Sequence, residues 1–284
     1  MRNILVVTGG AGFIGSNLIF ELLKFNKFKV LSIDNYTSGL SKNHIKNKRV
    51  KYLKGNTRNI EILLKGNASK IHSIFHFGEF ARIYQSFKKI DECFSSNIEG
   101  SSNVFNFALK NKIRLIYSAT SASLGNKGED MNLSPYAFSK AKNLELLENL
   151  KKWFNFRHEV IYFYNVYGER QICKGDMATV VGIFEDCFRL GKKLPVVRPG
   201  TQKRRFTHVF DTVKACIFAW KKNKSKHYSI ASKKSYSIIE LAKMFKSKIR
   251  YLPKREGERF ASALTKMNLN NKIIRLRAKI KVYI

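Results

Sequence analysis

The chain has 284 residues, and its 54 lysines and arginines against 20 aspartates and glutamates give a formal net charge of +34 at pH 7. Hydrophobic residues make up 44% and aromatic residues 13% of the chain, which is enough for a buried core and excludes a disordered basic tail or a histone-like arm. The sequence contains no apolar run long enough to span a membrane, and its amino-terminal apolar residues lead into a glycine-rich turn. We therefore expect a globular, cytoplasmic protein without a membrane partner.

The positive residues are distributed in short pairs from Lys24 to Lys281, without one dense block. A nucleic-acid interface usually gathers its cations on one element or beside an RNA-binding aromatic motif. Lysine, asparagine and isoleucine, all with A/T-rich codons, are abundant together, as in residues 43–48. We attribute the charge to compositional bias and expect no nucleic-acid partner, with polyanion binding as the alternative.

The four cysteines lie far apart in the sequence, with no C-x-x-C pair and no histidine at zinc-finger spacing. This pattern predicts isolated, reduced thiols and no metal site. The cysteines are Cys93, Cys173, Cys187 and Cys216.

The first 168 residues alternate short apolar runs with longer segments of helical period, which is typical of βα units and a parallel sheet. The predicted strands are Asn3–Thr8, Lys29–Ile33, Val50–Leu53, Ser73–Phe77, Arg114–Ser118 and Glu159–Tyr164. The predicted helices between them are Ile14–Leu23, Asn59–Lys65, Cys93–Lys110 and Pro135–Trp153. Six strands with crossover helices predict an α/β fold with a doubly wound parallel (Rossmann) sheet, which binds its ligand at the carboxyl ends of the strands.

Beyond Gly168 the elements become shorter and are punctuated by prolines. Helices are predicted at Ala178–Leu190, Val209–Lys221 and Ser237–Lys246. We expect residues 1–168 to form the Rossmann domain with the catalytic residues. Residues 169–284 would mainly form a smaller substrate-binding lobe, with some segments returning to the Rossmann core.

Residues 8–15, Thr-Gly-Gly-Ala-Gly-Phe-Ile-Gly, follow the first strand and open a helix. Gly9 permits the tight turn, Gly12 lets the backbone approach a pyrophosphate, and Gly15 allows the helix to pack closely on the strand. The free amides at the start of the helix favour phosphate binding. Asp34 ends the second strand, where a carboxylate accepts hydrogen bonds from ribose hydroxyls and repels a 2′-phosphate. This combination predicts NAD rather than NADP as the cofactor.

Tyr136 and Lys140 stand four residues apart at the start of a predicted helix, so they share one face. A tyrosine with a pKa near 10 is a poor base at neutral pH. A close lysine, aided by a positive nicotinamide ring, would lower this pKa toward the working range. The hydroxyl-rich segment 118–123 ends the preceding strand, and one of its hydroxyls could share a substrate oxygen with Tyr136.

These motifs, together with Tyr164-Asn165-Val166-Tyr167-Gly168, resemble the extended short-chain dehydrogenase/reductases. The likeness is nearest to the NAD-dependent nucleotide-sugar epimerase/dehydratase family and follows the same order over nearly the whole chain. The resemblance implies NAD as the cofactor and a nucleotide-diphosphate sugar, with UDP as the expected nucleotide, as the substrate. It also implies a homodimer formed through the predicted helices 93–110 and 135–153.

The resemblance also implies roles for individual residues. Thr120 would be the catalytic hydroxyl, with Ser121 as a substitute, Tyr136 the base and Lys140 its electrostatic partner. Cofactor contacts are expected at Gly9, Gly12, Phe13, Ile14, Gly15, Asp34, Asn35, Ser38, Gly39, Asn56, Thr57, Phe77, Gly78, Asn97, Ser118, Tyr136, Lys140 and Tyr164. Substrate contacts are expected at Arg82, Thr120, Ser121, Asn165, Arg204 and Arg255.

Some of these residues have alternative interpretations. Asn97 could be a helix cap, and Arg204 and Arg255 could be ordinary surface cations. Asn56 stands where relatives have an aspartate, so its amide would need a different arrangement of donors and acceptors toward adenine. Glu79 departs from the family pattern without an explanation, and Arg82 could either reach the substrate or pair with Glu79.

The residues after Thr120 favour one reaction among those of the family. By resemblance, sugar dehydratases follow this threonine with Asp-Glu and decarboxylases with Ser-Glu, whereas this chain has Ser121-Ala122. The absence of a second acid or base at these positions predicts a UDP-hexose 4-epimerase that acts through a transient 4-keto sugar. The alternatives are a dehydratase or reductase of the same family, or a non-catalytic relative that binds NAD or nucleic acid.

Overall fold

The computed structural model describes residues 2–124, 132–232 and 234–257. Its centre is a seven-stranded parallel sheet with the strand order β11-β6-β5-β4-β1-β2-β3. The strands are β1 (Ile4–Thr8), β2 (Lys29–Asp34), β3 (Val50–Lys54), β4 (Ile71–His76), β5 (Arg114–Thr120), β6 (His158–Phe163) and β11 (His227–Ser229). β1 pairs with both β2 and β4, so the order reverses beside β1 and creates the switch point at which such sheets bind ligands.

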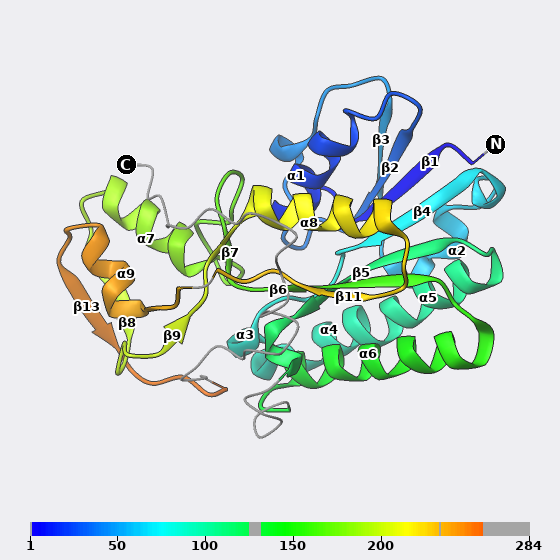
Figure 1. The fold of residues 1–284 in the computed structure, drawn as a ribbon. Helices are drawn as coiled ribbons and strands as arrows, with labels where there is room; N and C mark the ends of the chain where they lie inside the picture. Colours follow the sequence, from blue (N-terminus) through cyan, green and yellow to red (C-terminus); the bar gives the residue numbers. More distant parts are fainter. Residues whose placement is uncertain (1, 125–131, 233, 258–284) are drawn as a thin grey trace.

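Two layers of helices cover the sheet (Figure 1). One face carries α1 (Phe13–Leu22) and α8 (Val209–Lys222), which pack together over a shared apolar core. The other face carries α2 (Ile60–Leu63), α4 (Ile90–Phe94), α5 (Ser101–Lys110) and α6 (Pro135–Phe154), beside the short α3 (Ile83–Lys88). The inner strands β1 and β5 are buried along their whole length, which explains their continuous apolar runs.

The predicted Rossmann fold is confirmed, with differences in three elements. The three-residue strand β11 was not predicted and extends the sheet beyond β6. The helix predicted at Cys93–Lys110 begins earlier and is interrupted by a π-helical segment, Ser95–Gly100, between α4 and α5. Helix α3 was also not predicted, because its six residues are too few to show a helical period.

The remaining described elements form a smaller layer at one end of the sheet (Figure 1). Its helices are α7 (Val180–Arg189) and α9 (Ile238–Met244), and its paired strands are β8 (Leu194–Val197) with β13 (Ile249–Leu252) and β9 (Lys203–Arg204) with β12 (Tyr236–Ser237). These elements surround a separate apolar core. The strands β7 (Val166–Tyr167) and β10 (Thr207–His208) pair with each other, and α8 and β11 return the chain to the main sheet.

Within the ranges given above, no helix is both long enough and apolar enough to cross a lipid bilayer.

Candidate active site

The glycine loop between β1 and α1 has the backbone that the sequence motif requires. Gly9 adopts a φ of +71°, in the left-handed region that favours glycine. A Cβ atom at position 15 would lie 2.1 Å from the carbonyl oxygen of Gly9, so a side chain there would collide with the backbone. Helix α1 begins after Gly12 without a side-chain cap, which leaves its first amides for a ligand such as a pyrophosphate.

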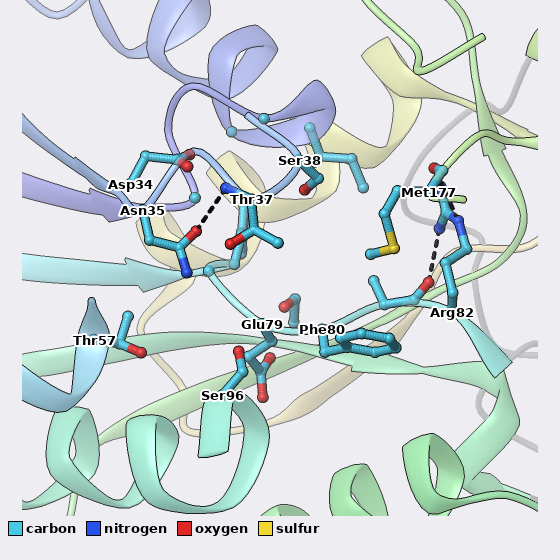
Figure 2. A pocket seen from close by; sticks show the side chains of 18 of the residues that line it. Asp34, Asn35, Thr37, Ser38, Thr57, Glu79, Phe80, Arg82, Ser96 and Met177 are labelled. Carbon is cyan, nitrogen blue, oxygen red and sulfur yellow. Dashed lines mark hydrogen bonds between the residues drawn. The ribbon is translucent and has the colours of Figure 1, made fainter. Parts of the chain in front are cut away.

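Asp34 holds the same loop from the end of β2. Its carboxylate accepts hydrogen bonds from the backbone amides of Ala11 and Tyr36, each at 2.9 Å. Burial raises the pKa of Asp34, and these backbone hydrogen bonds oppose the rise. The carboxylate lies against the glycine loop in Figure 2, where it can meet the ribose hydroxyls of a dinucleotide. The loop and its carboxylate therefore fit NAD.

A pocket of about 540 Å³ opens over the carboxyl ends of the strands, between the glycine loop and the first residues of the smaller layer. The predicted residues that line it are Gly9, Gly12, Phe13, Ile14, Gly15, Asp34, Asn35, Ser38, Asn56, Thr57, Phe77, Gly78, Arg82, Ser118, Tyr136 and Lys140. The pocket is also lined by Glu79, to which the sequence assigned no role, and by residues that the sequence did not single out: Ile33, Thr37, Gly55, Arg58, Phe80, Ala81, Lys89, Glu92, Ser95, Ser96, Ala119, Phe163, Ile172 and Met177. The two predicted groups thus meet in one cavity, the glycine loop at one end and Tyr136 with Lys140 at the other.

Helix α6 presents Tyr136 on its first turn. Ser134 caps the helix by accepting a hydrogen bond from the amide of Ala137 at 3.1 Å, and Pro135 occupies the first helical position. Burial raises the pKa of Tyr136 to about 12, while a hydrogen bond with Thr120 lowers it. Thr120 is the last residue of β5. Its hydrogen bond with Tyr136 shows that the predicted threonine and tyrosine lie next to each other. The pKa is nevertheless raised rather than lowered as the sequence suggested.

Burial is the largest cause of this rise in the pKa of Tyr136, and a buried carboxylate beside Lys140 adds to it. The ammonium of Lys140 forms an ion pair with Glu79 and donates a second hydrogen bond to the carbonyl of Ser118. The side chains of Lys140 and Glu79 are 4% and 3% exposed, so their charges are hardly screened by solvent. Glu79 partly offsets the positive charge of Lys140 at the phenol, and its own charge adds to the rise in the pKa of Tyr136.

Three further donors fix the Glu79 carboxylate, and each comes from a different element. Ser101 of α5 and the hydroxyl of Tyr117 of β5 donate to Glu79 Oε1 at 2.9 Å, and Asn143 of α6 donates at 3.2 Å. Together with Lys140, these donors satisfy a carboxylate that would otherwise be costly to bury. Glu79, which the sequence left unexplained, therefore ties α5, α6 and β5 together beneath the pocket.

A directional chain of hydrogen bonds connects Glu79 to the start of the glycine loop. Two backbone amides donate to Thr8 Oγ1, so the hydroxyl hydrogen of Thr8 is directed to His76 Nδ1 at 2.7 Å. The other ring nitrogen, Nε2, then carries the hydrogen and donates to Ser101 Oγ at 2.9 Å, and Ser101 donates to Glu79. Burial lowers the pKa of His76 to about 4, which keeps the ring neutral as this arrangement requires.

Asn97 lies in the π-helical segment and is fully buried behind the pocket. Its amide exchanges two hydrogen bonds with the backbone of Phe80, at 2.7 and 3.0 Å, and also donates to Ser139 at 3.0 Å. Asn97 thus supports the loop after β4 and does not itself line the pocket. Of its two predicted roles, support of the pocket agrees with these contacts, whereas a helix cap does not.

The pairing of Arg82 with Glu79, one of two possibilities left by the sequence, is not the arrangement found. Arg82 instead donates through Nη1 to the carbonyl of Ala81 at 2.7 Å and through Nε to the carbonyl of Met177 at 3.0 Å, as Figure 2 shows. Because Arg82 follows β4 and Met177 lies between β7 and α7, the bond to Met177 joins two distant segments that line the pocket.

The other predicted residues lie outside the lining of this pocket. Tyr164 is fully buried and receives a hydrogen bond from Ser229 at 3.1 Å. Asn165 donates to the carbonyl of Arg205 at 3.3 Å. Gly39 packs against the Asp34 carboxylate, and Thr120 and Ser121 lie where β5 ends. Arg204 lies in β9, and the guanidinium of Arg255 lies over the ring of Tyr84.

Replacing Asp34 with asparagine is expected to weaken NAD binding about 10- to 100-fold, because charged hydrogen bonds of about 1.5–3 kcal/mol are lost. The preference for NAD over NADP should also narrow, since the charge that repels a 2′-phosphate is gone. Titration calorimetry with both cofactors would measure this. The control is Glu61→Gln, which removes a carboxylate that is 70% exposed and pairs with Lys110. Unchanged NAD affinity in Asp34→Asn would contradict the assignment.

Comparisons with known proteins agree with this geometry. Residues 5–231 match the NAD dependent epimerase/dehydratase family. A protein of Methanocaldococcus jannaschii provisionally named UDP-glucose 4-epimerase is 30% identical over 273 residues, which cover 90% of this chain and 87% of that one. The ADP-L-glycero-D-manno-heptose-6-epimerase of Brachyspira hyodysenteriae is 30% identical over 261 residues, 86% of this chain and 80% of that one.

A solved structure agrees as well. The UDP-glucose 4-epimerase of Thermotoga maritima with UDP-glucose superposes with a TM-score of 0.84 at 26% identity and covers 92% of this chain and 89% of that one. The resemblance drawn from the motifs is thereby confirmed, and the cofactor of the family is NAD. The chain belongs to the NAD-dependent epimerase/dehydratase family.

Proposed function

We propose that this enzyme is a nucleotide-sugar 4-epimerase acting on a UDP-linked hexose. The observation that carries the proposal is the set of Thr120, Tyr136 and Lys140 without a free carboxylate beside it. Among the described lining residues the carboxylates are Asp34, Glu79 and Glu92. None is placed as a second acid or base: Asp34 is bound to the glycine loop, Glu79 to four donors, and Glu92 to Lys89 at 3.6 Å.

Tyr136 in the pocket lining, with Thr120 in hydrogen-bond reach of it, can perform the proton transfer that such a reaction needs. Tyr136 would take the proton of the sugar 4-hydroxyl and return it after the sugar has turned over, and Thr120 would hold the same oxygen. Lys140 would stabilise the phenolate. The hydrogen bond with Thr120 and the charge of Arg82 lower the pKa of Tyr136. NAD, when bound, supplies the acceptor that takes a hydride from C4 and gives it back to the other face.

Two arginines of the smaller layer would bind the diphosphate of the substrate. Arg204 lies in β9, half-buried, and Arg255 lies beyond β13 with its guanidinium 5.1 Å from the ring centre of Tyr84 on α3. The planar guanidinium matches the oxygens of a diphosphate, which supports this role. Asn165, between β6 and β7, would contact the sugar nucleotide.

Replacing Arg204 with alanine is expected to raise the KM for the nucleotide sugar about 10- to 100-fold and to change kcat by less than about twofold. The reason is that a charge-assisted contact of about 1.5–3 kcal/mol is lost equally from the bound substrate and the transition state. Steady-state kinetics would measure both constants. Arg189→Ala, in a surface pair of the same layer with a side chain 71% exposed, is the matched control. A fall in kcat without a change in KM would contradict the assignment.

The reaction can be tested with a panel of substrates. Purified protein with NAD would be incubated with UDP-glucose, UDP-N-acetylglucosamine and UDP-glucuronate, and the sugars followed by NMR. Interconversion of the 4-epimers of one of these sugars supports the proposal. A dehydrated or decarboxylated product, or oxidation that consumes NAD stoichiometrically at 340 nm, would overturn it.

We also propose a homodimer formed through α4, α5 and α6. Helices α4 and α6 lie side by side, and the rings of Phe94 and Phe138 are 6.1 Å apart between them. Ile90 and Phe138 remain exposed on this surface, which supports its burial against a second copy.

A further inference from the structure

We propose that Glu148, His158 and His227 form a zinc-binding site at the end of the sheet opposite the active site. The three residues come from α6, β6 and β11. One ligand atom from each lies within 4.8 Å of the other two. The cysteine spacing predicts no metal site, and the sequence gives no other hint, because these residues are separated by 10 and 69 positions in the chain.

His158 provides the strongest indication of a missing partner. Its ring is 1% exposed, and Nδ1 lies 3.2 Å from the carbonyl of Phe156. A carbonyl only accepts, so Nδ1 carries the hydrogen and Nε2 presents a lone pair. Nε2 is buried without a hydrogen-bond partner, and the nearest carboxylate oxygen, Glu148 Oε1, lies 3.5 Å away. In this tautomer the two facing atoms are both acceptors, an arrangement that a cation between them, either a proton or a metal ion, stabilises.

His227 and Glu148 complete the arrangement. Nε2 of His227 lies 2.8 Å from Glu148 Oε1, and its Nδ1 lies 3.1 Å from the hydroxyl of Tyr162. Zinc ligands at 2.0–2.2 Å in a tetrahedron are about 3.4 Å apart. Glu148 Oε1 lies 3.5 and 2.8 Å from the two histidine nitrogens, and all three ligand atoms lie within 4.8 Å of one another. Movements of up to about 1.4 Å in the half-buried Glu148 and His227 side chains would therefore bring all three ligand atoms to the separation that zinc requires. Metal-binding histidines usually hold their second ring nitrogen in a hydrogen bond, as both histidines do.

The chemistry of the donors also suits a cation. The ammonium of Lys151, on the same helix as Glu148, donates to the carbonyl of Ser225 at 2.9 Å. The site therefore offers two imidazoles and one carboxylate, a donor set suited to Zn²⁺.

The ion would have a structural effect. It would fasten the edge strand β11 and the start of β6 to α6, the helix that carries Tyr136 and Lys140 at its other end. Zinc that binds only the folded chain stabilises it in proportion to its concentration. At a hundredfold excess over Kd, the melting temperature should rise by about 5 °C.

The test uses the full-length chain, freed of any histidine tag and stripped with EDTA, and titrates it with ZnCl₂ by calorimetry and thermal melting. We expect one saturable ion per chain. Glu148→Gln and His227→Gln, both at exposed or half-buried positions, should weaken binding by at least about 100-fold and abolish the rise in melting temperature. Glu145→Gln, one turn away on α6 with a side chain 61% exposed, should bind as the unaltered chain does.

Two results would overturn the proposal. Absence of saturable Zn²⁺ binding would mean that a proton bridges His158 and Glu148. Equal binding by the unaltered chain and by Glu148→Gln would place the ion elsewhere, for example on the thiols of Cys173 or Cys187. Co²⁺ gives an independent readout, since a tetrahedral nitrogen and oxygen site should produce visible absorption bands that both variants lose. None of these measurements depends on epimerase activity.

Discussion

Tyr136→Phe is expected to reduce epimerase turnover about a thousandfold while leaving NAD affinity and melting temperature nearly unchanged. General acid-base catalysis by a positioned side chain contributes about 10²- to 10⁴-fold, and the substitution removes only the hydroxyl that transfers the proton. The backbone amide of Tyr136, which donates to Ser86 at 3.2 Å, is retained. The fold of the first turn of α6 should therefore survive.

The measurement is single-turnover and steady-state kinetics on the unaltered chain and the variant, with NAD affinity determined separately. Tyr251→Phe removes a hydroxyl from a side chain that is 46% exposed on β13 and serves as the matched control. Turnover within about tenfold of the unaltered chain in Tyr136→Phe would show that another group moves the proton.

Glu79→Gln is expected to lower the free energy of unfolding by about 3–5 kcal/mol, because it leaves the buried ammonium of Lys140 without a counterion. The amide oxygen of glutamine can still accept the bonds from Ser101 and Tyr117. The amide nitrogen then takes the position of Oε2, so the hydrogen bond from Lys140 is lost together with the charge. Urea denaturation would measure it. Glu145→Gln breaks an exposed pair with Lys142 on the same helix and should change the free energy of unfolding by less than about 1 kcal/mol.

The same substitution should shift the pH dependence of the reaction. Burial first and Glu79 second raise the pKa of Tyr136, to about 12. Without the carboxylate, the pKa of Tyr136 falls, and the phenolate forms at lower pH. The acid limb of the rate profile should therefore move to lower pH. The phenolate absorbance of Tyr136, taken as the difference between Glu79→Gln and the double variant Glu79→Gln/Tyr136→Phe, should also appear at lower pH. A limb that stays in place or moves to higher pH would show that Glu79 does not act on this phenol.

The sequence predicted the parts of the site that depend on local spacing. The glycine loop and Asp34 occupy consecutive βα units, so their positions follow from the Rossmann topology. Tyr136 and Lys140 share a helix face because they are one turn apart. These residues line one pocket, although their roles in binding and catalysis stay predictions until the variants are measured.

The features that the sequence missed depend on contacts between distant elements. Glu79 belongs to a loop, and its donors come from α5, β5 and α6, so no local pattern could indicate an ion pair with Lys140. The pKa of Tyr136 is raised first by burial and then by Glu79, and both depend on the tertiary structure. Strand β11 has three residues and pairs with β6 across a separation of about 70 positions, which is too short to give a strand period.

In the proposed 4-epimerase, the hydride removed from C4 returns to the same sugar. A UDP-hexose carrying deuterium at C4 would be incubated in ordinary water with the protein and NAD, and followed by NMR and at 340 nm. We expect a 4-epimer that retains deuterium at C4, with no net change in absorbance. Loss of the deuterium to solvent, or a stoichiometric rise at 340 nm, would contradict it.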